Sequence, residues 1–162
     1  MAISATTRPL RSGEVSGRDY HFLSEADFVR RVGEGEFLEH VVYVSGQRYG
    51  TLRSEVERIL SSGRSCVLEL ETQGAKEVVG LMPDAVSVFV QAPSFAELER
   101  RLLERATESA GEIGERLALA RAQMDEAADF DHVVTNDDLE RAAQELEGIV
   151  DAQVTATAER RR

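Results

Sequence analysis

Two arginines three residues apart near the start of the chain are the densest concentration of potential chemistry. Arg8 and Arg11 are flanked by hydroxyl residues, and Pro9 and Gly13 restrict the intervening turn. Planar guanidinium groups form paired hydrogen bonds with phosphate oxygens, so this spacing could clamp a phosphate, with Tyr20 as a neutral donor. An exposed basic turn without a ligand is the alternative interpretation of such an arginine pair.

Few other reactive groups are available. Cys66 is the only cysteine, which excludes an internal disulfide and a cysteine metal cluster and favours a reducing, cytoplasmic setting. Lys76 is the only lysine, so no mechanism can use a lysine elsewhere in these residues. His40 and His132 have no partner pattern and are expected to be structural. The first residues lack the apolar stretch of a signal peptide.

The composition is that of a globular protein. The 162 residues predict one domain, and the 42% apolar content is sufficient for a core. A formal charge of −11 argues against a general nucleic-acid binder, because most of the surface would repel a phosphate backbone. No apolar run approaches the roughly 18 residues of a membrane helix, so we expect no membrane association.

Strand-like and helical segments alternate along the chain. The expected strands are 2–4, 20–22, 37–44, 65–71, 86–90 and 131–135, and the expected helices are 24–31, 52–60, 74–81, 94–105, 113–128 and 138–150. Ser94 and Glu97 have the spacing of a capping box. This alternation predicts an α/β fold with a parallel sheet covered by helices on both faces.

Six strings resemble motifs of the guanylate kinase family, in the family's order from Ser4 to about Val150. They are SATTRPLRSGE with GRDYHF at 4–22, EFLE at 36–39, YGT at 49–51, LELETQGA at 68–75, RLLERATE at 101–108 and NDDL at 136–139. The resemblance implies a three-layer parallel sheet of the P-loop nucleoside monophosphate kinase type. It also implies a small GMP-binding subdomain and a helical lid, with the central first strand missing.

The resemblance assigns the first string and the tyrosine corner to the phosphate of GMP. Arg8, Arg11, Tyr20 and Tyr49 would hold this phosphate, and Glu14 would orient the arginines. Whether deoxy-GMP is also accepted stays open.

The same resemblance assigns the base of GMP to a second set of residues. Ser4, Glu39 and Thr51 would recognise guanine. A carboxylate accepts hydrogen bonds from the ring N–H and exocyclic amine of guanine, whereas adenine presents a different edge. Glu69 and Glu71 share a strand face and could assist the guanosine moiety or a hydrated magnesium; a solvated strand end is the alternative. Glu71 replaces the family's usual aspartate.

The resemblance also implies a lid that closes over the transferring phosphoryl group. Arg101, Arg105 and Arg116 would stabilise its charge, and Asn136 would lie on the ATP side. Ala106 replaces the glycine that the family has after the lid arginine, which could alter lid opening.

One family element has no counterpart in these residues. The family's Gly-x-x-Gly-x-Gly-Lys-Ser/Thr loop cradles the ATP phosphates and magnesium, and no such string occurs here. We therefore expect ATP with Mg²⁺ to serve only the intact kinase, and this chain to hold no metal of its own. The hypothesis is a clipped reading frame in which Met1 is an internal methionine of a longer enzyme that converts ATP and GMP to ADP and GDP.

A competing hypothesis is a catalytically inactive guanylate kinase-like binding domain. Arg8, Arg11 and Tyr20 would then capture GMP or a phosphorylated partner. This hypothesis fits the missing loop but leaves the lid arginines and Glu39 unexplained. The oligomeric state is not set by the sequence.

The expected organisation is one guanylate kinase-like domain over residues 1–154. Within it, the GMP-binding subdomain would span about 19–52 and the lid about 101–116. Residues 155–162 are expected to form a frayed charged tail.

Overall fold

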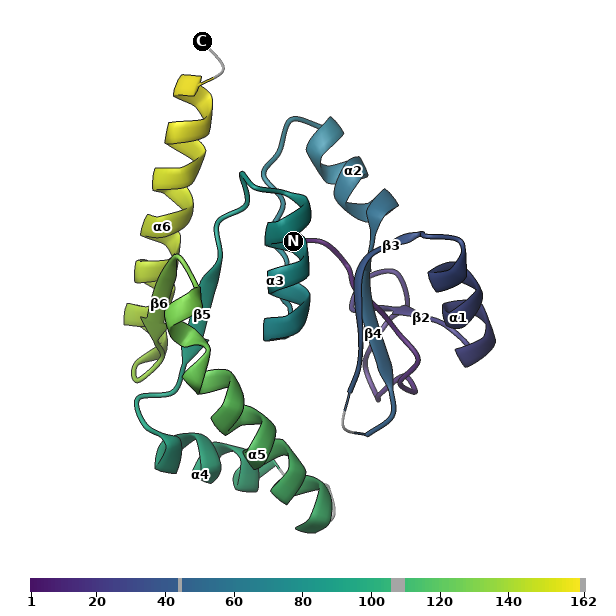
Figure 1. Cartoon of the computed structure of the whole chain (residues 1–162), viewed down its shortest axis with the longest axis vertical. Helices are drawn as coiled ribbons and strands as arrows, with labels where there is room; N and C mark the ends of the chain where they lie inside the picture. The colour runs from purple at the N-terminus through teal and green to yellow at the C-terminus, as the bar shows by residue number, and fades with distance from the viewer. Residues whose placement is uncertain (44, 106–109, 161–162) are drawn as a thin grey trace. The chain divides into compact units, whose positions relative to one another are not determined.

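The computed structural model describes residues 1–43, 45–105 and 110–160, and the chain divides into two compact units. Unit 1 is Met1–Pro83 and unit 2 is Asp84–Arg162. Each unit combines helices with its own sheet (Figure 1). The two are described separately below, and the predicted domain over 1–154 stays a prediction.

Unit 1 is built on a mixed sheet with the strand order β2-β1-β4-β3. The strands are β1 (Ala5–Thr6), β2 (His21–Phe22), β3 (Phe37–Val42) and β4 (Arg48–Leu52). β1 is parallel to β2, and the β1–β4 and β3–β4 pairs are antiparallel. Gly46 turns the β3–β4 hairpin with a φ of 78°, a left-handed conformation that glycine adopts without a Cβ penalty.

Three helices cover this sheet, α1 (Glu25–Gly33), α2 (Arg53–Ser61) and α3 (Thr72–Leu81). Side chains alternate along β3, so its neighbouring residues Phe37 and Leu38 enter different cores. Phe37 stacks on Phe28 of α1 with ring centroids 4.4 Å apart, and Leu38 packs with Val56 of α2 and Val78 of α3. Figure 1 shows α1 and α3 on opposite sides of β3 and β4.

The strand expected at 65–71 is wrong in its pairing but right in its alternation. Cys66, Leu68 and Leu70 pack on the Leu38 core, whereas the intervening Val67 is 46% exposed. No strand ladder forms over these residues in the described structure; the Val67 carbonyl accepts a single backbone hydrogen bond from Ala2 N–H. A strand requires a neighbouring strand along its length, and the alternating pattern does not provide one.

Unit 2 contains the parallel pair β5 (Val88–Gln91) and β6 (His132–Thr135). Its helices are α4 (Phe95–Arg105), α5 (Ala110–Asp125), the 3-10 helix η1 (Ala127–Asp129) and α6 (Leu139–Arg160). The predicted cap of α4 is confirmed, because Glu97 N–H donates to Ser94 Oγ at 3.2 Å. No described helix is long and apolar enough to cross a membrane.

The frayed tail expected from residue 155 is wrong for residues 155–160, which continue α6. Thr155 Oγ1 donates to the Asp151 carbonyl at 2.9 Å, within the helix. Ala156, Ala158 and Glu159 are strong helix formers, and extending an existing helix requires no new nucleation. Residues 161–162 lie outside the described part.

Candidate functional site

Arg8 is a buried guanidinium that its surroundings hold in one orientation. It follows β1, is 7% exposed, and donates to both carboxylate oxygens of Glu14 at 2.7 and 3.0 Å. Its guanidinium carbon lies 5.2 Å from the ring centroid of Tyr20 and 5.5 Å from that of Phe22. The hydrogen bond with Glu14 raises the pKa of Arg8, so the group is a permanent cation.

Glu14 hydrogen-bonds with both arginines that are predicted to bind phosphate. Besides Arg8, its carboxylate accepts a hydrogen bond from the Arg11 backbone N–H at 2.7 Å. Hydrogen bonds from Arg8 and from Arg11 lower the pKa of Glu14 to about 2. Gly13 permits this tight turn with a φ of 87°. The Arg11 side chain itself is exposed.

Two tyrosines lie beside Arg8. Tyr20 and Tyr49 meet edge to face with ring centroids 6.1 Å apart, and Tyr49 lies opposite Thr6 in the β1–β4 register. Burial raises the pKa of Tyr20, and the negative charge of Glu69 raises it further. Glu69 is exposed, and its charge acts on Tyr20 through space.

Glu39 is a carboxylate buried in β3. It is 5% exposed and lies opposite Thr51 of β4 in the sheet register. Burial raises the pKa of Glu39, and the neighbouring Thr51 offsets this only in part. The buried Thr51 Oγ1 lacks a well-formed hydrogen bond within the described structure. Glu39 and Thr51 thus present polar atoms that have little water around them.

Ser4 and Glu71 flank these groups in the chain. The half-buried Ser4 gives its carbonyl to His21 N–H at 2.9 Å, which joins β1 to β2. Glu71 is the N-cap residue of α3, and its carbonyl accepts from Ala75 N–H at 2.9 Å. All predicted GMP residues therefore belong to unit 1.

The predicted lid and ATP-side residues belong to unit 2. Arg101 of α4 donates to Glu97 at 2.7 Å and to the Asn136 carbonyl at 2.9 Å, so α4 is joined to the loop after β6. Arg116 is half-buried in α5. Arg105 ends α4, its side chain lies outside the described part, and so do residues 106–109 of the predicted lid.

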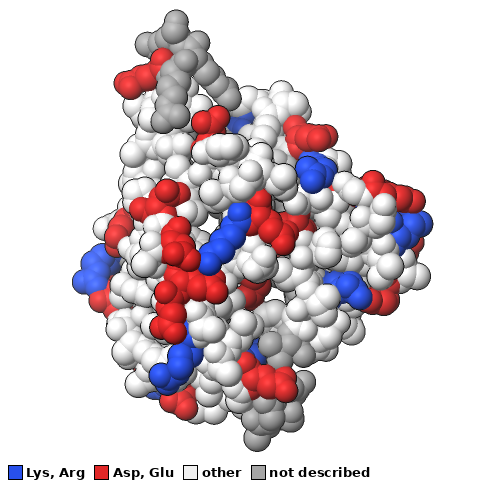
Figure 2. Space-filling model, viewed as in Figure 1, with Lys and Arg blue, Asp and Glu red and all other residues white. Residues whose placement is uncertain are grey.

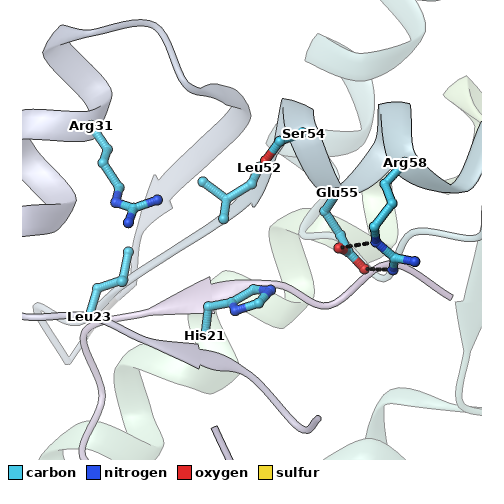
Figure 3. A pocket seen from close by; sticks show the side chains of 7 residues that line it. All are labelled: His21, Leu23, Arg31, Leu52, Ser54, Glu55 and Arg58. Atoms are coloured by element: carbon cyan, nitrogen blue, oxygen red, sulfur yellow. Dashed lines mark hydrogen bonds and ion pairs between the residues drawn. The ribbon is translucent and has the colours of Figure 1, made fainter. Parts of the chain in front are cut away.

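A separate hollow of about 280 Å³ lies in unit 1 (Figure 3). It is lined by His21, Leu23, Arg31, Leu52, Ser54, Glu55 and Arg58. Its guanidinium groups already have carboxylate partners, Arg58 in Glu55 and Arg31 in Glu36. No predicted site residue lines this hollow, which is therefore distinct from the Arg8 site.

Surface charge and metal ligands limit what else the molecule could bind. On the face drawn in Figure 2, basic side chains lie beside acidic ones and form no continuous basic area. Among the described residues, no three His, Cys, Asp or Glu side chains are grouped to hold a metal ion. These residues therefore do not fit a magnesium site whose ligands all come from the protein.

Comparison with known proteins agrees with the fold and the motifs. A sequence model of the family described as guanylate kinase matches residues 1–153. A guanylate kinase from Rubrobacter xylanophilus is 51% identical over 145 residues, covering 90% of this chain and 75% of that protein. A guanylate kinase from Thermus thermophilus is 46% identical over 161 residues, covering 99% and 70%.

A solved structure gives the same answer. The crystal structure of guanylate kinase from Anaplasma phagocytophilum matches with a TM-score of 0.79 and 33% identity, covering 94% of this chain and 74% of that one. The α/β fold of the P-loop nucleoside monophosphate kinases is therefore confirmed as the class of this protein. Within that class, the chain belongs to the guanylate kinase family.

Some contributors to the site are not evident from the sequence. Phe22 supports the Arg8 guanidinium, and Thr6 Oγ1 accepts from Arg8 N–H at 3.1 Å. Thr6 belongs to the hydroxyl-rich string around Arg8, so the sequence contained a signal that could have indicated it. Gly74 stands in the Gln-Gly motif, but nothing in the sequence indicates that it adjoins Glu39.

Proposed function

We propose that this chain binds GMP and forms the acceptor and lid portions of an enzyme that transfers a phosphoryl group from ATP to GMP. The observation that carries the proposal is the buried Glu39 carboxylate on the same sheet as the buried Arg8 guanidinium. One group suits a base that donates hydrogen bonds, and the other suits a phosphate.

The phosphate of GMP would bind at Arg8 and Arg11, with the hydroxyls of Tyr20 and Tyr49 as neutral donors. Glu14 would keep the Arg8 fork in place until the phosphate arrives. A phosphate accepts paired hydrogen bonds from such forks with geometric specificity.

The guanine base would bind at Ser4, Glu39 and Thr51. The Glu39 carboxylate would accept from the ring N–H and the exocyclic amine. Adenine lacks a ring N–H donor and a 2-amino group at these positions, so AMP would leave the buried carboxylate unpaired. Glu69 and Glu71 would contact the guanosine moiety.

Phosphoryl transfer would require more than the printed residues contain. Arg101, Arg105 and Arg116 would neutralise the charge of the transferring group, with Asn136 on the ATP side. The phosphate-cradling loop motif is absent from the printed sequence, so we expect these 162 residues alone to bind GMP without turnover. Magnesium would enter with ATP, and a cytoplasmic location stays a prediction.

Calorimetric titration of the chain tests the binding proposal. GMP should bind with at least about tenfold preference over AMP, and a phosphoserine peptide should bind more weakly than GMP. Arg8→Ala should weaken GMP binding by about 10–100-fold, because a charge-assisted paired contact is lost.

Arg30→Ala is the matched control, since it removes the same charge from the exposed face of α1. It should leave GMP affinity unchanged. Preference for the phosphopeptide would instead favour an inactive binding domain, and equal affinity for AMP and GMP would contradict guanine recognition. Titration with deoxy-GMP would show whether the 2′-hydroxyl contributes.

A further inference from the structure

Gly74 lies unusually close to the buried carboxylate of Glu39. A Cβ atom at Gly74 would stand 2.6 Å from Glu39 Oε2 and 3.2 Å from its Cδ, separations shorter than ordinary van der Waals contact. The described glycines at 33, 80, 114 and 148 also lie in helices, yet a Cβ there would have no neighbouring atom within 4 Å. The absence of a side chain at Gly74 is therefore what makes room for Glu39.

The Glu39 carboxylate is the part of this contact that can shift, because it is the far end of a flexible side chain, whereas the backbone around it is packed. Its side chain is buried, and α3 packs directly on β3. The backbone of Glu39 is closely packed, since a Cβ at Gly50 of the paired strand would lie 2.8 Å from the Glu39 carbonyl oxygen. A methyl group at position 74 would therefore move the carboxylate rather than the surrounding strand.

The position of Gly74 in α3 also suits a negative charge. It is the third residue of a ten-residue helix, Thr72–Leu81, and the first turn of a helix carries partial positive charge. The positive end of the helix opposes, without cancelling, the rise in the pKa of Glu39 that burial causes. The ionised form is the one that accepts two hydrogen bonds from guanine.

We propose that Gly74 is a positioning residue that sets the reach of Glu39 and thereby the selectivity for guanine. This inference rests on the proposed GMP function. Displacing the carboxylate should affect most strongly a base that donates twice, as guanine does. Hypoxanthine, which has the ring N–H but no amine, should lose less. Adenine, without either donor, should lose nothing.

The test compares Gly74→Ala with Gly80→Ala in the chain as it stands. Gly80 lies in the same helix and has free space, so the control makes the same chemical change without the clash. Gly74→Ala should raise the Kd of GMP by about 10–100-fold and the Kd of IMP by less. The ratio of the IMP Kd to the GMP Kd, which measures the preference for GMP, should therefore shrink towards one. Ribose 5-phosphate affinity should not change in either variant.

A rescue variant separates positioning from a general structural role. Glu39→Asp shortens the side chain by one methylene and frees space beside residue 74. The clash in Gly74→Ala should lower the melting temperature, and adding Glu39→Asp should restore much of that loss, so the two changes should be non-additive in a double-mutant cycle.

The possible failures are distinguishable. A wild-type chain that binds no GMP overturns the proposed function and this inference together. If the wild-type chain binds GMP and Gly74→Ala leaves the preference for GMP over IMP unchanged, this inference alone is overturned. A Gly74→Ala chain that is unfolded and is not restored by Glu39→Asp overturns it as well.

Discussion

At the scale of single residues, two carboxylates of unit 1 respond to their surroundings in opposite directions. Glu14 hydrogen-bonds with Arg8 and has a pKa of about 2, so it favours folding above pH 4.5 and loses that effect as the pH falls. Glu39 is buried and its pKa is raised. One carboxylate thus holds a binding group in place, and the other is kept available for a ligand despite an unfavourable environment.

Replacing Glu39 with glutamine should increase the stability of the chain and remove its selectivity for guanine. Because its folded pKa is raised, the native state retains its proton to higher pH than the unfolded chain does. The free energy of unfolding should therefore fall as the pH rises from about 4.5 through the raised pKa. Glu39→Gln removes this dependence and should stabilise the chain near pH 7 by on the order of 1 kcal/mol.

Urea unfolding of both proteins between pH 4 and pH 8 provides the measurement, with GMP titration in parallel. The variant should lose its preference for GMP over AMP while it gains stability. If the free energy of unfolding changes with pH in the same way in both proteins, burial of the ionised Glu39 side chain does not destabilise the chain.

At the scale of elements, α1 depends on one aromatic side chain. Phe28 is fully buried and stacks on Phe37. Phe28→Ala should lower the free energy of unfolding by about 3–5 kcal/mol, because it leaves a cavity between α1 and the sheet. The neighbouring Val29 is 49% exposed, so Val29→Ala should change stability by only about 0.5 kcal/mol or less.

Tyrosine fluorescence during urea unfolding measures this effect in the relevant unit. Tyr20, Tyr43 and Tyr49 are the three tyrosines of the sequence, which has no tryptophan, and they all lie in unit 1. Equal losses for the two alanine variants would mean that α1 does not depend on the Phe28–Phe37 stack.

The elements also show which features a sequence can predict. The Ser94 cap involves residues close in the chain, so local spacing was sufficient to predict it. The contact between Arg8 and Glu14 is also local, but it was expected from the family resemblance and not from spacing. The segment 65–71 was predicted correctly in alternation and wrongly in pairing, since pairing depends on a distant partner. The approach of Gly74 to Glu39 likewise requires α3 to pack on β3, which no local pattern encodes.

At the scale of the whole molecule, ligand binding and folding are linked by mass action. A ligand that binds only the native state stabilises it by about 2.7 kcal/mol at a concentration of 100 Kd. All the residues proposed for GMP lie in unit 1, so GMP should raise the melting temperature reported by tyrosine fluorescence. The formal charge of −11 makes this a specific test, because a general attraction for anions is not expected.

Thermal melts with GMP, AMP and inorganic phosphate at equal concentrations would check this prediction. GMP should shift the tyrosine-reported transition most, and phosphate least, because phosphate can use the arginines but not Glu39. The Arg8→Ala chain should lose most of the GMP shift, whereas Arg30→Ala should keep it. Equal shifts with GMP and phosphate would mean that the guanidinium groups act alone and that the buried carboxylate has no part in recognition.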